Sequence, residues 1–450
     1  MLTRPGKAGN AGCPTNRGAD TVKQFVSWAV AAGPALATPV LAQDKPSKIG
    51  VGIFTFTSGP AAAYGMPGRN AAELMIDKIN KEGGMGGVPL SPIYVDEAQG
   101  TDRVVAEFRR LAADETNQVM IAALSSGNCL ALAPVAEQLG APMLAWNCDT
   151  HQMLLKDRYN FVYRANSSTI PEFVALAMYL LEVKPDIKTV GIINPDYAFG
   201  HDAAAIFKAA LQSQKPDIQI VAELFPRLGS SSYQTEISRL ASARPDVIFS
   251  NLWGADLENF VRQALPRGLF QNSQAVLAAS EPILQRVKLP DGVITGALGD
   301  GWWLSPTAQK NKANLEFVED YRKRFNEYPV FPSFKMANTI LVMKAAYEKA
   351  IKAKSGGWPT RKEIAAALKG IEVETLTGDV KLREEDNDGL VDQIVGVTVS
   401  SDKYPFPVIG NMARYPAEKV TPPAGQDPFE WIKTLNKGFR DDLPKPGSYK

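Results

Sequence analysis

The chain has 450 residues, of which 45% are hydrophobic and 22% charged, values that are typical of globular proteins and argue against disorder. Its 49 basic and 48 acidic residues nearly cancel, so no strong field would attract nucleic acid or anionic lipid. The only two histidines, His151 and His201, disfavour histidine-based metal sites and most acid–base enzymes.

Residues 1–42 have the layout of a cleavable secretory signal peptide. Arg17 and Lys23 precede an apolar stretch over 25–42, which ends in a Val-Leu-Ala sequence before Gln43. A membrane anchor is the alternative, but a glycine and two prolines interrupt the stretch, and a span needs about 20 apolar residues. Cleavage removes four basic residues and one acidic residue and leaves 45 basic and 47 acidic residues, a net charge of −2. We therefore expect a periplasmic protein without stable membrane insertion.

From residue 48 onward, short apolar runs alternate with amphipathic helical patterns. The runs are apolar on both faces, as in parallel strands that helices cover on both sides. The predicted strands are 48–54, 119–124, 142–146, 189–194, 219–225, 246–251, 274–279 and 292–297. The predicted helices are 70–81, 103–113, 130–139, 170–181, 202–211, 233–243, 255–265, 313–325 and 334–352. This alternation predicts a doubly wound α/β fold.

The number of strands exceeds what one open sheet usually holds, so two α/β lobes are expected. Ligands of such sheets bind at the carboxyl ends of the strands, and two facing lobes would form a cleft there. The segment from Ser401 is rich in proline and has one plausible short helix over 427–436, which predicts an extension on the surface.

Polar residues follow two neighbouring strands of the first half. Ser126, Gly127 and Asn128 lie between the run ending at residue 124 and a helix, where free backbone N–H groups attract acceptors; plain helix capping is the compatible alternative. Asn147 and Asp149 follow the next strand in the same way. Adjacent strands would bring these loops together, and with them Cys129 and Cys148, whose pairing in an exported protein is possible but not decided by the sequence.

Aromatic residues gather at the predicted strand ends. Tyr64 follows a Ser-Gly-Pro turn after the first strand. Phe199, Trp253 and Trp302 follow strands of the second half. Single aromatics usually belong to the core, but several on one rim could wall a ligand slot or hold a cation over a ring face.

Catalytic and cofactor motifs are absent. The sequence has no GxSxG, HExxH or CxxC, and no GxGxxG after a strand. Asp149 and Glu281 could form an acid–base pair of the glycosidase kind, but nothing in their spacing supports one. We therefore expect neither an enzyme nor a bound cofactor.

The order and spacing of several segments over roughly 48–400 resemble the periplasmic Leu/Ile/Val-binding family of ABC-transporter receptors. They are KIGVGIFTFTSGPAAAYG, INKEGGMGGVPLSPIYVDEAQ, the serine-rich strand end, DYAFG and SSSYQTEISRLASARPDVIFS. The resemblance implies a type I periplasmic binding fold, with two lobes joined by three crossovers that close on a ligand. The implied domains are a first lobe of 43–163 and 298–372, a second lobe of 164–297 and 373–400, and a C-terminal extension of 401–450.

The resemblance also implies roles for the strand-end residues. Tyr64 would cover the ligand, and Phe199 and Trp253 would be the aromatic contacts of the second lobe. The ligand carboxylate would be held by Ser126 with the backbone after it, by backbone at Asn147 and by the residue at 149. The residue implied as the acceptor for the ligand ammonium is Glu281.

Asp149 departs from the family pattern, which has a hydroxyl residue at this position. A carboxylate there would repel a ligand carboxylate unless it is protonated or turned away. Together with Trp253 and the loop containing Trp302, Asp149 makes a bulkier, aromatic or more cationic amino acid or amide as plausible a ligand as leucine. The expected partner is an ABC permease, and the alternatives are a sensing module of the same fold or an enzyme acting in the cleft.

Overall fold

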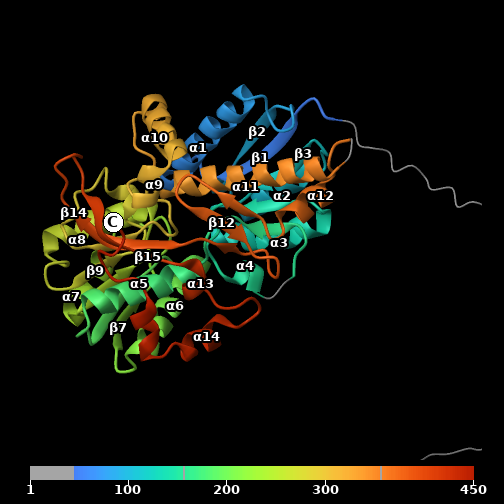
Figure 1. Cartoon of the computed structure of the whole chain (residues 1–450). Helices are drawn as coiled ribbons and strands as arrows, with labels where there is room; N and C mark the ends of the chain where they lie inside the picture. Colours follow the sequence, from blue (N-terminus) through green and yellow to red (C-terminus); the bar gives the residue numbers. More distant parts are fainter. Residues whose placement is uncertain (1–44, 156–157, 355–356) are drawn as a thin grey trace, which may run out of the picture. The chain divides into compact units, whose positions relative to one another are not determined.

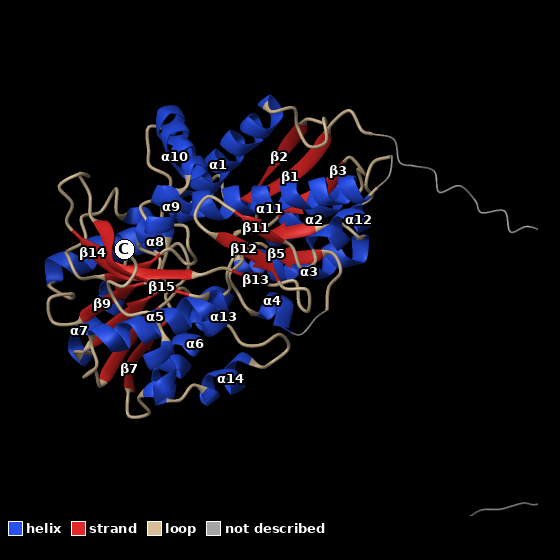
Figure 2. Cartoon of the chain, viewed as in Figure 1, coloured by secondary structure: helices blue, strands red, loops and turns tan. Residues whose placement is uncertain are grey.

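The computed structural model describes residues 45–155, 158–354 and 357–450. The predicted signal peptide, residues 1–42, lies outside the described residues. The strands gather in two main sheets, each flanked by helices, so the mixed α/β fold with two lobes is confirmed (Figures 1 and 2).

The first lobe is built on a parallel five-stranded sheet of order β2-β1-β3-β4-β5. Its strands are β1 (Ile49–Thr55), β2 (Leu90–Asp96), β3 (Asn117–Ile121), β4 (Met143–Ala145) and β5 (Val162–Arg164). The longer helices around it are α1 (Ala62–Lys81), α2 (Thr101–Ala112), α3 (Ser126–Leu139), α10 (Lys312–Phe325), α11 (Phe331–Ala353) and α12 (Arg361–Leu368). Every residue of β1 is buried, because helices cover both faces of the sheet.

The second lobe is built on a seven-stranded sheet of order β15-β14-β10-β9-β8-β6-β7. Its strands are β6 (Thr189–Ile193), β7 (Gln219–Leu224), β8 (Val247–Ser250), β9 (Gln274–Leu277), β10 (Ile294–Gly296), β14 (Gln393–Val399) and β15 (Val408–Tyr415). Its helices include α5 (Thr169–Val183), α6 (Ala198–Gln214), α7 (Gln234–Ala243), α8 (Gly254–Ala264), α13 (Ala417–Val420) and α14 (Pro428–Thr434). The run 169–181 of α5 is buried all round, which explains why this helix is apolar on every side.

Three short crossings join the lobes, between β5 and α5, between β10 and the short helix α9 (Pro306–Lys310), and from β13 (Gly389–Leu390) to β14. They lie beside one another, because the Ile394 N–H donates to the Gly299 carbonyl at 2.9 Å and the Ser167 hydroxyl to the Leu298 carbonyl at 3.4 Å. A small antiparallel sheet of β11 (Glu372–Glu374), β12 (Asp379–Leu382) and β13 precedes the third crossing.

Residues 401–450, expected as a surface extension, contribute a strand to the second sheet. β15 pairs antiparallel with β14, and Ala413 and Tyr415 are fully buried. Further along, α14 packs against α6 (Figure 1). The sequence pattern did not predict this strand, because prolines flank it and polar residues interrupt its apolar run.

The remaining short elements complete the connections. They are the helix α4 (Gln152–Leu155) and the 3-10 turns η1 (Glu97–Gln99), η2 (Leu265–Arg267), η3 (Glu281–Ile283) and η4 (Lys437–Asp442). Of these, η1 and η3 matter for the site, because each places a buried carboxylate next to the carboxyl ends of the strands.

Candidate functional site

The carboxyl ends of the strands enclose a small cavity between the two lobes. Its volume is about 20 Å³, and both lobes line it. The lining residues are Tyr64, Leu124, Ser126, Asn147, Asp149, Tyr197, Phe199, Trp253, Ala279, Leu298 and Phe331. This volume holds about one water molecule, so a larger solute enters only when the lobes or the lining side chains move.

A larger hollow of about 400 Å³ lies on the first lobe among α1, α10 and α11. It is lined by helix side chains such as Met75 and Phe317, with Lys78 and Glu82 also present. The cavity between the lobes is the candidate site, because it collects the strand ends of both sheets.

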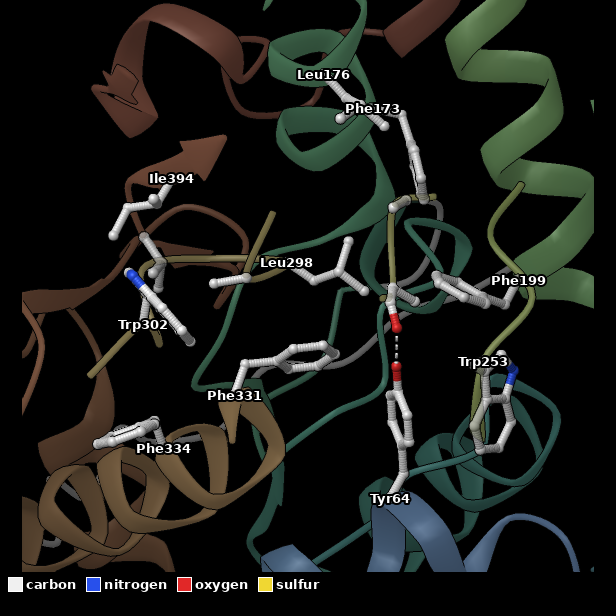
Figure 3. Packing of buried hydrophobic residues seen from close by; sticks show 14 of the residues in the cluster. Tyr64, Phe173, Leu176, Phe199, Trp253, Leu298, Trp302, Phe331, Phe334 and Ile394 are labelled. Carbon is white, nitrogen blue, oxygen red and sulfur yellow. Dashed lines mark hydrogen bonds between the residues drawn. The ribbon is translucent and has the colours of Figure 1, made fainter. Parts of the chain in front are cut away.

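Aromatic rings form one wall of the cavity. The ring of Tyr64, from α1, lies 5.2 Å from that of Trp253 and 5.4 Å from that of Phe331, between ring centroids. The Tyr64 hydroxyl donates a hydrogen bond of 2.5 Å to the carbonyl oxygen of Ala279, after β9 (Figure 3). Burial raises the pKa of Tyr64 well above its ordinary value, so this hydroxyl stays protonated and joins the two lobes.

The polar end of the cavity is formed by Ser126, Asn147 and Asp149, from the loops after β3 and β4. The side-chain oxygen Oδ1 of Asn147 is buried and has no hydrogen-bond partner among the residues that the structure describes. Such an oxygen lining a cavity is available to a ligand donor.

Asp149 is paired with a lysine that the sequence analysis missed. The Nζ atom of Lys335, from α11, lies 2.8 Å from Oδ1 of Asp149 and 3.4 Å from Oε1 of Glu172. All three side chains are buried, and the Ser167 hydroxyl donates a further bond of 2.7 Å to Glu172. Lys335 supplies one positive charge for two carboxyl groups, so it stabilises Asp149 without removing the repulsion expected between Asp149 and a ligand carboxylate.

Burial controls the titration of this cluster. It raises the pKa of Asp149, against the lowering effect of Lys335. Burial and the neighbouring Asp149 raise the pKa of Glu172 to about 8. Two carboxyl groups thus share one lysine, so the cluster either carries one excess negative charge or holds one proton.

A further buried carboxylate, Glu97, contacts the loop that precedes α3. It accepts hydrogen bonds from the N–H groups of Leu124 and Ser125 and from the side chain of Asn128, at 2.7, 3.1 and 2.8 Å. Burial raises the pKa of Glu97 to about 7. Asn128 therefore supports the loop, and its Oδ1 also accepts from the Thr101 hydroxyl at 2.8 Å.

Six of the predicted ligand residues line the cavity, and four do not. Tyr64, Ser126, Asn147, Asp149, Phe199 and Trp253 line it; Gly127, Asn128, Glu281 and Trp302 do not. Gly127 is exposed, and Trp302 packs in the core beside Trp303, with 5.9 Å between ring centroids. Figure 3 shows Trp302 on the far side of Phe331 from Tyr64.

Glu281 makes a contact between the lobes that differs from its predicted role. Its Oε2 accepts a hydrogen bond of 2.9 Å from the backbone N–H of Phe331, at the start of α11. Burial raises its pKa to about 8. Glu281 and Asp149 have different partners, so the structure gives no support to an acid–base pair of these two residues.

Sequence reasoning also missed five lining residues of the cavity, all apolar or aromatic. They are Leu124, Tyr197, Ala279, Leu298 and Phe331. Tyr197 lies two residues before Phe199 in the segment DYAFG, so its position offered a signal. Lys335 offered no comparable signal, since the same helix also carries Lys344 and Lys349.

The loops that carry the polar residues are covalently joined. Cys129 of α3 and Cys148 after β4 form a disulfide with 6.2 Å between their Cα atoms. Arg164 also holds the second loop, because its Nη1 donates to the carbonyl oxygens of Cys148 and Thr150, both at 2.7 Å. The disulfide and Arg164 therefore restrain the loops at the polar end of the cavity.

The lobes also meet through Asp202, on α6. Its carboxylate accepts from the Thr150 hydroxyl at 2.5 Å and from the Gln152 amide at 2.6 Å. Beside it, His151 is buried and its Nδ1 lies 2.9 Å from the hydroxyl of Thr169.

Over 45–155, 158–354 and 357–450, no group of three histidine, cysteine, aspartate or glutamate side chains is placed to hold a metal ion. Within the same ranges, no helix has the length and apolarity that crossing a membrane requires.

Comparisons with known proteins agree with this architecture. The family model for periplasmic binding proteins matches residues 48–403. Leu/Ile/Val-binding protein homolog 7 of Brucella abortus is 25% identical over 319 residues, which are 68% of this chain and 77% of that protein.

Solved structures match over most of the chain. A solute-binding protein of an ABC transporter from Rhodopseudomonas palustris, in complex with 3,4-dihydroxybenzoic acid, has a TM-score of 0.72 at 22% identity, over 85% of this chain and all of that chain. A branched-chain amino acid transporter substrate-binding protein from Streptococcus pneumoniae, in complex with isoleucine, has a TM-score of 0.65 at 17% identity, over 78% and 95% of the two chains.

Proposed function

Because this chain belongs to the family of periplasmic binding proteins, we propose that it captures a small solute between its lobes and presents it to an ABC permease. The observation that carries the proposal is the cavity itself, whose lining comes from strand ends of both lobes. The three adjacent crossings provide a hinge about which the lobes can separate. Closure would then remove the solute from water and strengthen its hydrogen bonds.

The proposed solute is an amino acid or a related small amide or aromatic compound. The aromatic wall suits an apolar or aromatic group, and the loops after β3 and β4 suit a polar group. The structural neighbours described above were solved with isoleucine and with 3,4-dihydroxybenzoic acid, which are small molecules of these classes.

The experiment is a thermal-shift screen of the protein from Gln43, unfolded and refolded to remove any carried-over solute. The panel contains amino acids, amides, aromatic acids, sugars and polyamines. A solute at about 100 times its dissociation constant adds about 2.7 kcal/mol to the free energy of unfolding. We expect one chemical class to raise the melting temperature and to reduce the radius of gyration in X-ray scattering; no shift with any compound would contradict the proposal.

The transport role has a separate test. Deletion of the permease subunit should abolish cellular uptake of the solute identified in the screen. Unchanged uptake would favour the alternative, a sensing module of the same fold. Turnover of the bound solute, lost in Asp149→Asn without loss of binding, would favour an enzyme instead.

Export is proposed to use residues 1–42 as a cleaved signal peptide. The expectation is periplasmic protein whose N-terminal sequence begins at Gln43. Protein recovered from the membrane fraction with residues 25–42 intact would indicate an anchor.

A further inference from the structure

One ionisable carboxylate lines the described cavity, and it belongs to the first lobe. Asp149 is that residue, whereas Glu281 does not line the cavity and accepts the N–H of Phe331 at 2.9 Å. The acidic group that a ligand would meet therefore lies in the loop after β4.

The neighbours of Asp149 in the cavity add a second acceptor. Oδ1 of Asn147 is buried without a hydrogen-bond partner in the described part of the chain, and its residue lines the same end of the cavity. An oxygen in this position gains a hydrogen bond only when a ligand brings a donor.

The positive groups nearby already have partners. Lys335 contacts both Asp149 and Glu172 and is not among the lining residues. Arg164 pairs with Asp388 at 2.7 Å and holds the loop backbone. Neither cation is directed to a ligand carboxylate by the contacts that the structure shows.

Two backbone donors just before α3 are already occupied. The N–H groups of Leu124 and Ser125 donate to Glu97, a carboxylate of the chain itself. A ligand carboxylate at the start of α3 would face the carboxyl groups of Glu97 and Asp149, which would repel it.

We propose that the solute presents an N–H donor, as an ammonium or an amide, to Asp149 and Asn147, and that the site selects against a carboxylate there. This inference rests on the proposed function and specifies its solute class. The apolar part of the solute lies against Tyr64, Phe199 and Trp253, whose faces also favour a cation. Lys335 is a positioning residue, because it holds Oδ1 of Asp149 and leaves the rest of the carboxylate to the solute.

The test uses two series that keep the side chain and change the polar group: phenylalanine, phenylalaninamide and phenethylamine, and leucine, leucinamide and isopentylamine. Calorimetric titration of the refolded protein from Gln43 measures each dissociation constant. We expect the amide or the amine to bind at least about tenfold more tightly than the amino acid of its series, in line with hydrogen bonds to charged groups.

Variants distinguish a specific effect of the Asp149 carboxylate from a general loss of folding or binding. Asp149→Asn should reduce this preference at least about tenfold and improve the binding of the amino acid. A second variant, Asp149→Ser, removes the same carboxylate, leaves Lys335 paired with Glu172 and should show the same reversal, so the test does not depend on the folding of one variant. The matched control is Asp246→Asn, whose carboxylate accepts from backbone N–H groups of Lys188 and Thr189 away from the cavity; it should keep the wild-type preference.

The outcomes distinguish this inference from the proposed function. Equal or tighter binding of the amino acids, unaffected by Asp149→Asn, overturns the inference and leaves the receptor function standing. Absence of binding by both series overturns the inference as well, while the receptor function is then decided by the wider thermal-shift panel.

Discussion

The hydroxyl of Tyr64 and the carbonyl oxygen of Ala279 are 2.5 Å apart and lie on different lobes. Tyr64 extends from α1 of the first lobe, and Ala279 follows β9 of the second. A residue that lines the cavity thus also joins the two lobes, so we predict that ligand affinity and closure depend on the same side chain.

Tyr64→Phe should weaken solute binding by about two- to tenfold, because one buried hydrogen bond contributes about 0.5–1.5 kcal/mol. Titration calorimetry with the solute identified by screening measures the change, and X-ray scattering should show a larger radius of gyration for the variant. Tyr94→Phe is the matched control, since the hydroxyl of Tyr94 has no hydrogen-bond partner in the described residues. An equal loss in both variants would contradict the role of the contact.

Lys335→Met should destabilise the protein by about 3–5 kcal/mol at pH 7, because it leaves Asp149 and Glu172 buried without their cation. Without Lys335 the folded-state pKa values of both carboxyls rise further above their unfolded values, so the deficit should shrink as the pH falls and they take up protons. Urea unfolding between pH 5 and pH 8 measures both effects.

The control for Lys335→Met lies on the same helix. Lys344 pairs with Glu348, which follows it by one turn of α11, and both side chains are partly exposed. Lys344→Met should cost at most about 0.5 kcal/mol. A deficit of Lys335→Met that is as small, or that grows at low pH, would contradict the ion-pair account.

Glu281→Gln should become progressively more stable relative to the wild type as the pH rises from 5 to 9. Burial raises the folded-state pKa of Glu281 to about 8, so its contribution to stability is present at low pH and is lost as the pH rises through that value. Glutamine keeps an oxygen for the N–H of Phe331 and cannot ionise. Thermal unfolding over this pH range measures the difference, which should remain constant if the pKa of Glu281 is ordinary.

Replacement of Cys129 and Cys148 by serine should lower the free energy of unfolding by about 3 kcal/mol, the value for a disulfide that closes a loop of this length. It should also weaken solute binding, because the disulfide joins the loops of Ser126 and Asn147. Dithiothreitol should reduce the melting temperature of the wild type and leave the variant unaffected. Equal melting temperatures of the two proteins without reductant would show that the bond does not form.

The strands that sequence patterns predicted are those with continuous apolar runs, such as β1 and β6. β2 was missed because Pro92 and partly exposed residues break its pattern, which an edge strand tolerates. β5 was missed because its three residues include Arg164 and lie in no longer apolar run, whereas β4 and β10 are as short but lie in apolar runs. A strand that is buried on both faces is recognisable from its continuous apolar run. A strand without such a run, at an edge or of only a few residues, forms because neighbouring strands pair with it, which the local sequence does not show.

The polar residues of the site were predictable where a strand end places them, as for Asn147 and Asp149. Lys335 was not, because it meets Asp149 across 186 residues of sequence and from within a helix. The family resemblance implied that Glu281 binds the ligand, and nothing local in the sequence indicates that the start of α11 lies within reach of its carboxylate. Ion pairs and hydrogen bonds between segments that are distant in the sequence decide which charged groups remain available to a ligand.

The pairing of β15 with β14 has a practical consequence for any truncated form of this chain. The family match ends at residue 403, yet β15 begins at Val408 and covers the outer edge of β14. A protein cut at the end of the match would expose the unpaired N–H and carbonyl groups of 393–399, a largely buried and apolar strand, to other chains. Self-association of such a fragment would then reflect an open sheet edge rather than a natural oligomer, and the smallest reliable folding unit extends beyond the region that defines the family.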